Sequence, residues 1–202
     1  SGTLYVRLAA TATVSGSYNS QNIALTSSGA STVNIATAAS GNTVTAKGLT
    51  ITGISISNKT YDGSTSATIS GTAAYSGLVN GESFSVSGSP SATFSDKNVG
   101  NGKSVSVSGY NVPSSNYSIT EPTGLTANIT SKELTVASAA VTTKTYDGTN
   151  TANITGSLSG VVSGDAVTFN GTGTFASANV GTGISVTSTS SLSGSDAGNY
   201  TL

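Results

Sequence analysis

The sequence predicts an all-β protein built from tandem antiparallel β-sandwich domains, Ig-like in broad form and strung end to end. Three observations support this prediction. Apolar residues alternate with Ser and Thr in short runs, Gly and Asn-Gly pairs separate the runs, and one set of motifs occurs twice about 85 residues apart. The alternative is a β-grasp-like repeat, which needs one helix per copy. Its candidate window, 71–79, contains Gly71 and Gly77 and is a poor helix former.

The expected strands follow from a period of two, which places one side chain in the core and the next outside. Thr at the intervening positions suits a pleated surface. The clearest runs are Leu49–Ile51, Phe84–Val86, Val105–Val107, Leu125–Ile129, Leu134–Val136 and Val167–Phe169.

The composition excludes several classes of protein. Ser, Thr and Gly number 38, 33 and 25 of 202 residues, whereas seven Lys or Arg and eight Asp or Glu are the only charges. Without Cys or His there is no disulfide, thiolate nucleophile, Ser-His-Asp triad or Cys/His zinc site. A net charge of −1 with no basic cluster argues against nucleic acid as a partner. With 35% hydrophobic residues and almost no net charge, the chain is not of the disordered type.

Four motifs recur in the same order. Lys-Thr-Tyr-Asp-Gly is followed by a Gly-Glu or Gly-Asp turn, then by Asn-Val-Gly, then by Asn-Tyr. The spacing slips between 85 and 81 residues, as expected for insertions in loops. The repeated residues are Lys59, Tyr61, Asp62, Gly63, Asn98, Gly100, Asn116 and Tyr117 in the first copy, and Lys144, Tyr146, Asp147, Gly148, Asn179, Gly181, Asn199 and Tyr200 in the second.

These repeats divide the chain into three expected domains. Residues 1–46 lack the Tyr-Asp-Gly signature, so we expect them to be the closing strands of a preceding β-domain, at Tyr5–Leu8, Ile23–Leu25 and Val33–Ile35. Residues 47–131 form one complete repeat, and 132–202 form a second that stops before its last strand. No apolar run is long enough to span a membrane, and Ser1-Gly2-Thr3 does not begin a signal peptide. We therefore expect a segment of a longer protein without membrane insertion in this part.

The order of motifs resembles the YDG repeat of large bacterial surface proteins, and the resemblance covers roughly residues 47–202. Residues 2–8 and 27–34 are similar to segments that precede such repeats in Bacteroidetes-type secreted proteins. The resemblance implies a secreted or cell-surface multidomain adhesin, a group that includes gliding-motility adhesins. It implies neither a catalytic activity nor a known ligand, and we expect no enzyme, cofactor or metal.

The motif residues have structural interpretations that we prefer. Asp62-Gly63 and Asp147-Gly148 suit tight turns, because Asp bonds the backbone ahead and Gly accepts a positive φ. Tyr61 and Tyr146 are expected to lay their rings on the core, with carbohydrate stacking as the alternative. Asn116-Tyr117 and Asn199-Tyr200 resemble the corner tyrosine of sandwich domains.

Two stabilising devices remain open. Calcium needs six to eight oxygen ligands, but the acids of each copy are scattered and form no Asp-x-Asp-x-Asp ladder. They are Asp62, Glu82, Asp96 and Glu121 in the first copy, and Glu133, Asp147, Asp165 and Asp196 in the second. An intramolecular Lys–Asn isopeptide bond would draw on Lys59 or Lys144, with Glu82 or Asp165 as the acid. A lysine at a strand edge more often serves to prevent edge pairing.

Two functions from different classes follow. The favoured one is an extracellular stalk, in which each repeat has its neighbours in the same chain as partners and an adhesive region elsewhere contacts surface glycans or other cells. The alternative is a module that itself binds glycans or surface ligands through exposed aromatic residues. Tyr75 and Tyr110 are its candidates, although Leu158 and Ser191 replace them in the second copy.

Overall fold

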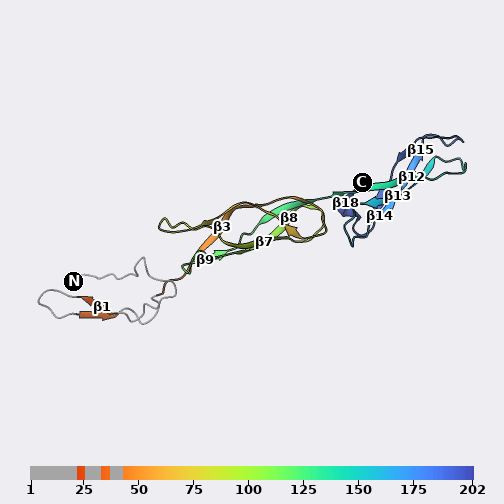
Figure 1. The fold of residues 1–202 in the computed structure, drawn as a ribbon. Helices are drawn as coiled ribbons and strands as arrows, with labels where there is room; N and C mark the ends of the chain where they lie inside the picture. The colour runs from red at the N-terminus through yellow and green to blue at the C-terminus, as the bar shows by residue number, and fades with distance from the viewer. Residues whose placement is uncertain (1–21, 26–32, 37–42) are drawn as a thin grey trace. The chain divides into compact units, whose positions relative to one another are not determined.

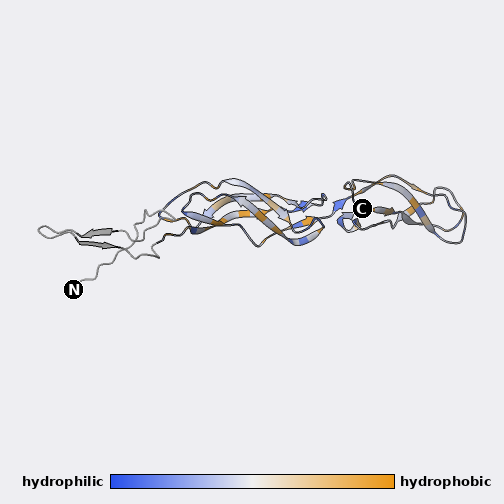
Figure 2. Cartoon of the chain, turned by 90° about the horizontal axis from the view of Figure 1, so that it is seen from below, coloured by the Kyte–Doolittle hydropathy of each residue, from blue (hydrophilic) through white to orange (hydrophobic). Residues whose placement is uncertain are grey.

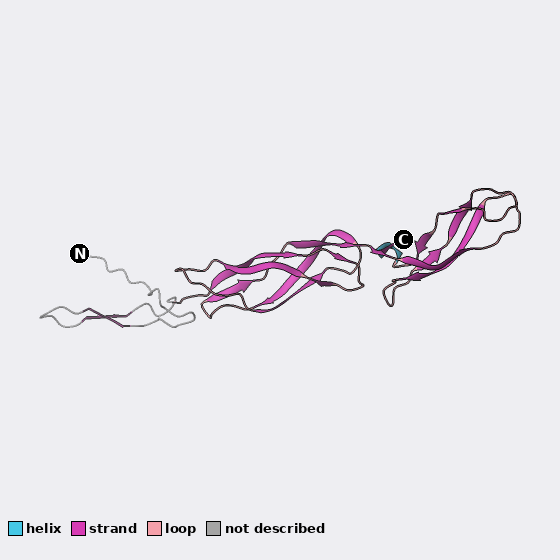
Figure 3. Cartoon of the chain, turned by 45° about the horizontal axis from the view of Figure 1, so that its top comes forward, coloured by secondary structure: helices cyan, strands magenta, loops and turns pink. Residues whose placement is uncertain are grey.

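The computed structural model describes residues 22–25, 33–36 and 43–202, and in these residues the fold is almost entirely β. Figure 1 shows the chain as a series of strands. The one helix among the described residues is a single 3-10 turn, η1 (Ala197–Asn199), drawn in cyan near the C-terminus in Figure 3. The all-β prediction is therefore confirmed. No helix in the described residues is long and apolar enough to cross a membrane.

The chain divides into two compact units that do not coincide with the two sequence repeats. The first comprises residues 1–54, 71–90 and 108–122, and the second comprises 55–70, 91–107 and 123–202. The second unit therefore contains one part of the first repeat together with the whole of the second repeat.

The region expected to precede the repeats contains one pair of described strands. Strands β1 (Asn22–Leu25) and β2 (Val33–Ala36) pair antiparallel, with Ile23 opposite Ile35. Both coincide with expected strands. The third expected strand of this region, Tyr5–Leu8, lies outside the described residues.

The first repeat contributes two sheets. One has the order β4-β10-β8-β7-β5 and the other the order β6-β3-β9. Their strands are β3 (Lys47–Ile56), β4 (Lys59–Thr60), β5 (Ser66–Ala67), β6 (Ile69–Ser76), β7 (Gly88–Phe94), β8 (Gly100–Tyr110), β9 (Tyr117–Thr120) and β10 (Leu125–Thr130). Strand β6 occupies most of the window considered for a β-grasp helix, so that alternative does not apply here.

The second repeat contains the sheet β12-β13-β15-β16 and the pairs β11-β18 and β14-β17. Its strands are β11 (Lys132–Glu133), β12 (Thr135–Val141), β13 (Thr151–Ser159), β14 (Thr168–Asn170), β15 (Thr172–Phe175), β16 (Val186–Ser188), β17 (Ser191–Ser193) and β18 (Tyr200–Thr201).

Between the strands of the described residues antiparallel pairing predominates, but three pairings are parallel, which the sequence did not indicate. Strand β3 pairs with β9 through Lys47 opposite Tyr117, and β11 pairs with β18 through Lys132 opposite Tyr200. In addition, β10 pairs with β4 through Ile129 opposite Lys59. The first strand of each repeat thus lies beside a late strand of the same repeat, because the intervening chain crosses to the other sheet.

The core follows the period-two pattern in most of the expected runs. The run Phe84–Val86 is an exception, because it lies before β7 outside any strand and Phe84 is 38% exposed. Along β8, Val105 and Val107 are buried whereas Ser104, Ser106 and Ser108 are exposed. Along β10, Ala127 and Ile129 are buried in the same way. Hydrophobic residues therefore appear as separate patches along the strands, surrounded by polar residues (Figure 2). The thin core results from the abundance of Ser and Thr at the outward positions.

Candidate functional site

The repeated Tyr-Asp-Gly motif forms the same local turn in both copies. In the first, Asp62 Oδ1 accepts hydrogen bonds from the Ser64 backbone N–H at 2.8 Å and from Lys59 Nζ at 2.7 Å. In the second, Asp147 Oδ1 accepts equivalent bonds from Thr149 N–H and Lys144 Nζ, both at 2.8 Å. The glycine that follows has φ 78° in each turn. The aspartate thus bonds the backbone ahead of it, as expected for a turn.

The hydrogen bonds from the lysines lower the pKa values of the aspartates in these turns. The hydrogen bond from Lys144, assisted by the Thr149 N–H, lowers the pKa of Asp147 to about 2. Partial burial acts to raise the pKa of Asp62, but the hydrogen bonds from Lys59 and Ser64 outweigh it and lower the pKa. Each lysine therefore stabilises its own turn through an ion pair with the aspartate of that turn.

A second arrangement that occurs in both repeats involves the Gly-acid turn and the tyrosine of the Asn-Tyr motif, which we call the late tyrosine. The Asp165 N–H donates to Val162 O at 3.1 Å, and the Glu82 N–H donates to Val79 O at 3.0 Å, closing equivalent four-residue turns. The hydroxyl of Tyr200 accepts from the Val162 N–H at 2.9 Å and donates to Asp165 at 2.6 Å. In the first copy, the Tyr117 hydroxyl makes the corresponding bonds with the Val79 N–H and the Glu82 carboxylate.

The Tyr-Asp-Gly motif of the first repeat contacts the Gly-acid turn of the second repeat. The hydroxyl of Tyr61 donates to Asp165 Oδ2 at 2.7 Å, although 104 residues separate the two in sequence. The ring of Tyr61 packs edge-on against the ring of Tyr200, with centroids 5.3 Å apart. Tyr61 is only 2% exposed. One carboxylate therefore receives a tyrosine hydroxyl from each of the two repeats.

Lys97 completes the charge arrangement at this carboxylate. Its Nζ lies 3.1 Å from Asp165 Oδ1, 3.9 Å from Asp196 Oδ1 and 5.9 Å from the centroid of the Tyr61 ring. The side chain of Asp165 is only 3% exposed, whereas that of Lys97 is 39% exposed. The ammonium group thus covers the carboxylate from the solvent side.

A third contact joins the Asn-Val-Gly motif of the first repeat to the Asn-Tyr motif of the second. The Val99 N–H donates to Asn199 Oδ1 at 2.9 Å, and Asn199 Nδ2 donates to Asn98 Oδ1 at 3.2 Å. Asn199 is buried, and its amide is satisfied by these two bonds. Gly63 also belongs here, because a Cβ at this position would lie 2.7 Å from Val162 Cγ1.

We call this contact the joint, and define it by Tyr61, Gly63, Lys97, Asn98, Val99, Val162, Asp165, Asn199 and Tyr200. Every one of these residues belongs to the second compact unit. The joint brings together a segment of each of the four repeated motifs, two from either copy. Sequence reasoning considered Asp165 only as a calcium or isopeptide acid, and it missed Lys97 and Val162. The only hint was that the Gly-acid turn kept its acid in both copies.

The electrostatics of the joint favour a charged carboxylate beside neutral phenols. Hydrogen bonds from Tyr200 and Tyr61 hold the pKa of Asp165 below its ordinary value of 3.8, and Lys97 acts in the same direction. Burial and the bond to Asp165 raise the pKa of Tyr200 to about 12, and the same two causes raise that of Tyr61. The hydrogen bond to Asp165 in turn raises the pKa of Lys97.

Of the other expected site residues, Asn116 and Gly100 lie at strand ends, and Asn179 and Gly181 lie in the loop between β15 and β16. Asn116 is exposed, with its carbonyl accepting from the Lys47 N–H at 2.9 Å. Gly100 begins β8 opposite Ile129 of β10. Asn179 and Gly181 are exposed, and the Asn179 N–H bonds Ser177 Oγ at 3.1 Å.

Neither a calcium site nor a Lys–Asn isopeptide bond, the two stabilising devices considered from the sequence, has clear geometric support in the described residues. The residues that the structure describes contain no group of three or more His, Cys, Asp or Glu side chains placed to hold a metal ion. The Nζ atoms of Lys59 and Lys144 bond the Asp, Ser and Thr groups of their own turns. An isopeptide bond to asparagine therefore has no pre-aligned partner in these contacts.

Tyr75 and Tyr110, the candidates of the glycan-binding alternative, are half-buried. Tyr146 is 63% exposed, so the prediction that its ring lies on the core is wrong, whereas that for Tyr61 is confirmed. The Tyr75 hydroxyl donates to Asn111 O at 2.6 Å, so it serves the fold. Tyr110 is also half-buried, and its backbone N–H donates to Glu121 Oε1 at 3.2 Å.

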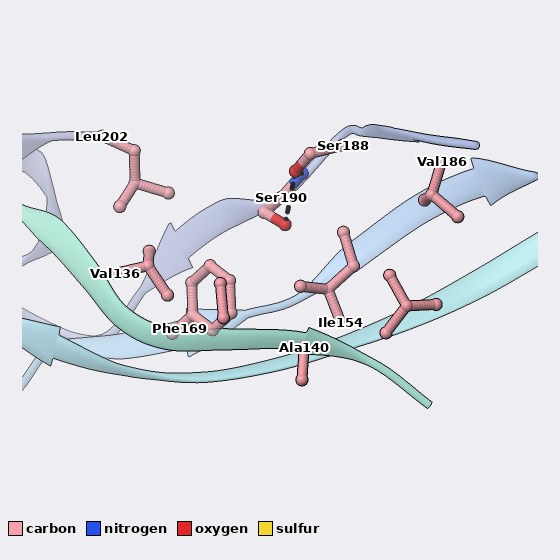
Figure 4. A pocket seen from close by; sticks show the side chains of 10 residues that line it. Val136, Ala140, Ile154, Phe169, Val186, Ser188, Ser190 and Leu202 are labelled. Atoms are coloured by element: carbon pink, nitrogen blue, oxygen red, sulfur yellow. Dashed lines mark hydrogen bonds between the residues drawn. The ribbon is translucent and has the colours of Figure 1, made fainter. Parts of the chain in front are cut away.

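An apolar pocket of about 390 Å³ lies within the second repeat (Figure 4). Val136, Ile154, Phe169, Val186 and Leu202 form its walls, and only the hydroxyls of Ser188 and Ser190 add polarity among the side chains drawn. The pocket holds no charged group that could do acid–base chemistry. Val186 corresponds to Val105 of the first repeat, which pairs with Leu125 of β10. Among the described residues β16 is the edge strand of its sheet, whereas its counterpart β8 pairs with β10, so a strand placed like β10 would cover the pocket.

Comparison with known proteins agrees with the motifs. The family model of the YDG domain matches residues 45–124 and 130–202, which is more than half of the chain. The chain therefore belongs to the YDG domain family, of which it contains two copies. No curated protein and no solved structure matches it.

Proposed function

We propose that this chain is a segment of a structural stalk, in which YDG repeats of a secreted or cell-surface bacterial adhesin hold an adhesive region away from the cell. Gliding motility is the kind of process such an adhesin would serve. The single observation that carries this proposal is the use of the repeated residues. Tyr61 and Asn98 of one copy contact Asp165 and Asn199 of the next, so the signature residues bind a neighbouring repeat.

A stalk needs defined contacts between neighbours, and the joint supplies them with little dependence on oxidation. The chain has no Cys, Met or Trp, and the joint consists of hydroxyl, carboxylate, amide and ammonium groups. The half-buried state of Tyr75 and Tyr110 argues against the alternative in which each repeat binds glycans through these two residues.

The test is small-angle scattering on chains with increasing numbers of complete repeats. The maximum dimension should grow by a constant increment of about 35–45 Å for each repeat, given about 3.3 Å per strand residue. A matched series carrying Asp165→Ala at each joint should lose the constant increment, because the neighbours are then held only by the connecting chain. A maximum dimension that stays nearly constant as repeats are added would refute the stalk and favour a folded binding surface, for which a glycan screen is the next step.

A further inference from the structure

The second repeat displays an uncovered copy of the surface that the first repeat uses in the joint. Tyr146 corresponds to Tyr61 but is 63% exposed, and Val180 corresponds to Val99 but is 89% exposed. A Cβ on Gly63 would meet Val162 of the other repeat, whereas a Cβ on Gly148 would have no atom within 4 Å. We call Tyr146, Gly148, Asn179 and Val180 the open face.

The open face already has the conformation that the joint requires. The Asp147 turn repeats the Asp62 turn bond for bond, with Thr149 N–H and Lys144 Nζ on Asp147 Oδ1. Gly148 has the same φ of 78° as Gly63. Docking would therefore order few groups that are not already ordered, which lowers the entropic cost of binding.

The complementary surface is also present in this chain. Joint formation needs a carboxylate on a Gly-acid turn, a tyrosine hydroxyl bonded to it, and an asparagine before that tyrosine. The first repeat carries all three as Glu82, Tyr117 and Asn116, and both Glu82 and Asn116 are exposed. A YDG repeat thus bears a tyrosine face and an acidic face, and the two faces fit each other.

We propose that the open face is a docking surface for a further YDG repeat that follows in the same chain. The partner would seat its acidic turn on the Tyr146 hydroxyl and its Asn-Tyr pair on the backbone of Val180. This proposal rests on the proposed role of these domains as consecutive structural repeats, and it adds which residues of one repeat recognise the next. An interface of this head-to-tail kind does not close on itself, so it permits any number of repeats.

The new joint would differ from the observed one in charge. The position of Lys97 is occupied in the second copy by Ala178, and that of Asp96 by Ser177. No ammonium group would therefore cover the partner carboxylate from this side, and two tyrosine hydroxyls would be its donors. We expect the joint made by Tyr146 to be the weaker of the two, and Ala178→Lys to strengthen it.

The experiment measures the chemical accessibility of Tyr146. The full chain is extended after Leu202 with a copy of residues 120–202 and then of 120–130, since Leu202 occupies the register position of Ile119. Each repeat then has its counterpart of β10. Tyrosines are nitrated with tetranitromethane. The rate of nitration at each position is measured by peptide mass spectrometry in the chain of residues 1–202, called the native chain here, and in the extended chain.

In the native chain, Tyr146 should be nitrated faster than Tyr61 by about tenfold or more, since reaction at a buried ring requires local opening. In the extended chain the rate at Tyr146 should fall toward that of Tyr61. The matched control is the extended chain with D165N in the appended copy only, where the rate at Tyr146 should rise again while Tyr61 stays protected.

Two outcomes would overturn the proposal. The first is a rate at Tyr146 that is equal in the native and extended chains while Tyr61 remains protected. The second is protection of Tyr146 that disappears on dilution, which would make the occupant a separate copy. Rapid nitration of both Tyr61 and Tyr146 in the native chain would instead refute the joint, and with it the support for the proposed function.

Discussion

The two copies of the repeat hold the same tyrosine in opposite environments. Tyr61 is 2% exposed and bonds Asp165, whereas Tyr146 is 63% exposed. The turns that present them are alike, with the same aspartate bonds and the same glycine φ. The difference therefore arises from the neighbour and not from the local sequence. This comparison separates what the motif does for its own turn from what it does for contact between repeats.

The acidic faces differ in the same way. Asp165 has a side chain that is 3% exposed and Asn199 is 5% exposed, whereas their counterparts Glu82 and Asn116 are exposed. Within each repeat, however, the bond from the late tyrosine to the acid is made in both copies. The tyrosine-acid bond is thus a feature of the domain, and the joint is built upon it.

The largest effect is expected from adding a strand beside β16, the edge strand of its sheet among the described residues. Appending a copy of residues 120–130 after Leu202 adds the counterparts of Leu125 and Ile129, whose burial should stabilise this repeat by about 3–5 kcal/mol. Hydrogen exchange at the β16 amides should slow accordingly, because the strand would gain a second partner. The same addition with Ser at the two apolar positions is the control. Unchanged exchange at β16 would show that the apolar pocket is not the place of this strand.

The next largest effect is expected from truncating the equivalent tyrosines, which should change the free energy of unfolding by different amounts in the two repeats. Tyr61→Ala should lower the free energy of unfolding by about 3–4 kcal/mol, as for other buried aromatic residues. Tyr146→Ala, at an exposed position, should change it by less than about 0.5 kcal/mol. Urea unfolding of the full chain measures both. Similar losses for the two variants would mean that Tyr61 contributes little through the joint.

The pH dependence should identify Asp165 as the charged centre of the joint. Its pKa is lowered in the folded state, so its contribution is present above the ordinary value of 3.8 and is lost as the pH falls through the lowered value. The pKa of Tyr200 is raised to about 12, so its contribution is present below 10 and is lost as the pH rises toward 12. The difference in melting temperature between the native chain and Asp165→Asn should be widest from about pH 5 to 9, where it reflects about 1–2 kcal/mol.

Asp147→Asn is the matched control for this profile. The pKa of Asp147 is also lowered, to about 2, but the bonds to its carboxylate come only from its own turn. Its variant should change stability on the acid side and leave the alkaline side as in the native chain. Indistinguishable profiles for the two variants would count against a special role of the joint.

The smallest effect is expected at Lys97. Because its side chain is 39% exposed, Lys97→Gln should lower the free energy of unfolding only slightly, and the loss should shrink in high salt. Ala178→Lys should leave the stability of this chain nearly unchanged, since the open face has no carboxylate to meet. A large effect of Lys97→Gln would show that the ammonium group, and not the phenols, holds Asp165.

The local features of the fold could be predicted, and the joint could not. Alternation around Val105 and Ile129 indicated strands, and the Asp-Gly pairs indicated turns, because these patterns depend on near neighbours. The bond from Tyr61 to Asp165 spans 104 residues, and an identical motif at Tyr146 lacks it. Nothing in either motif distinguishes the two situations. The parallel pairings escaped prediction for the same reason, since a period of two does not reveal which strand lies alongside.

The parallel pairing of β3 with β9 has a mechanical consequence. A pull on the two ends of the first repeat would draw Lys47 toward the preceding residues and Thr120 toward the following ones, in opposite directions along two paired strands. The hydrogen bonds between the strands then share the load in shear and must break together, whereas an antiparallel hairpin pulled from its open end breaks one bond at a time. The same geometry recurs between β4 and β10 and between β11 and β18. We therefore expect the parallel pair of β3 and β9 to resist extension of the first repeat along its own chain.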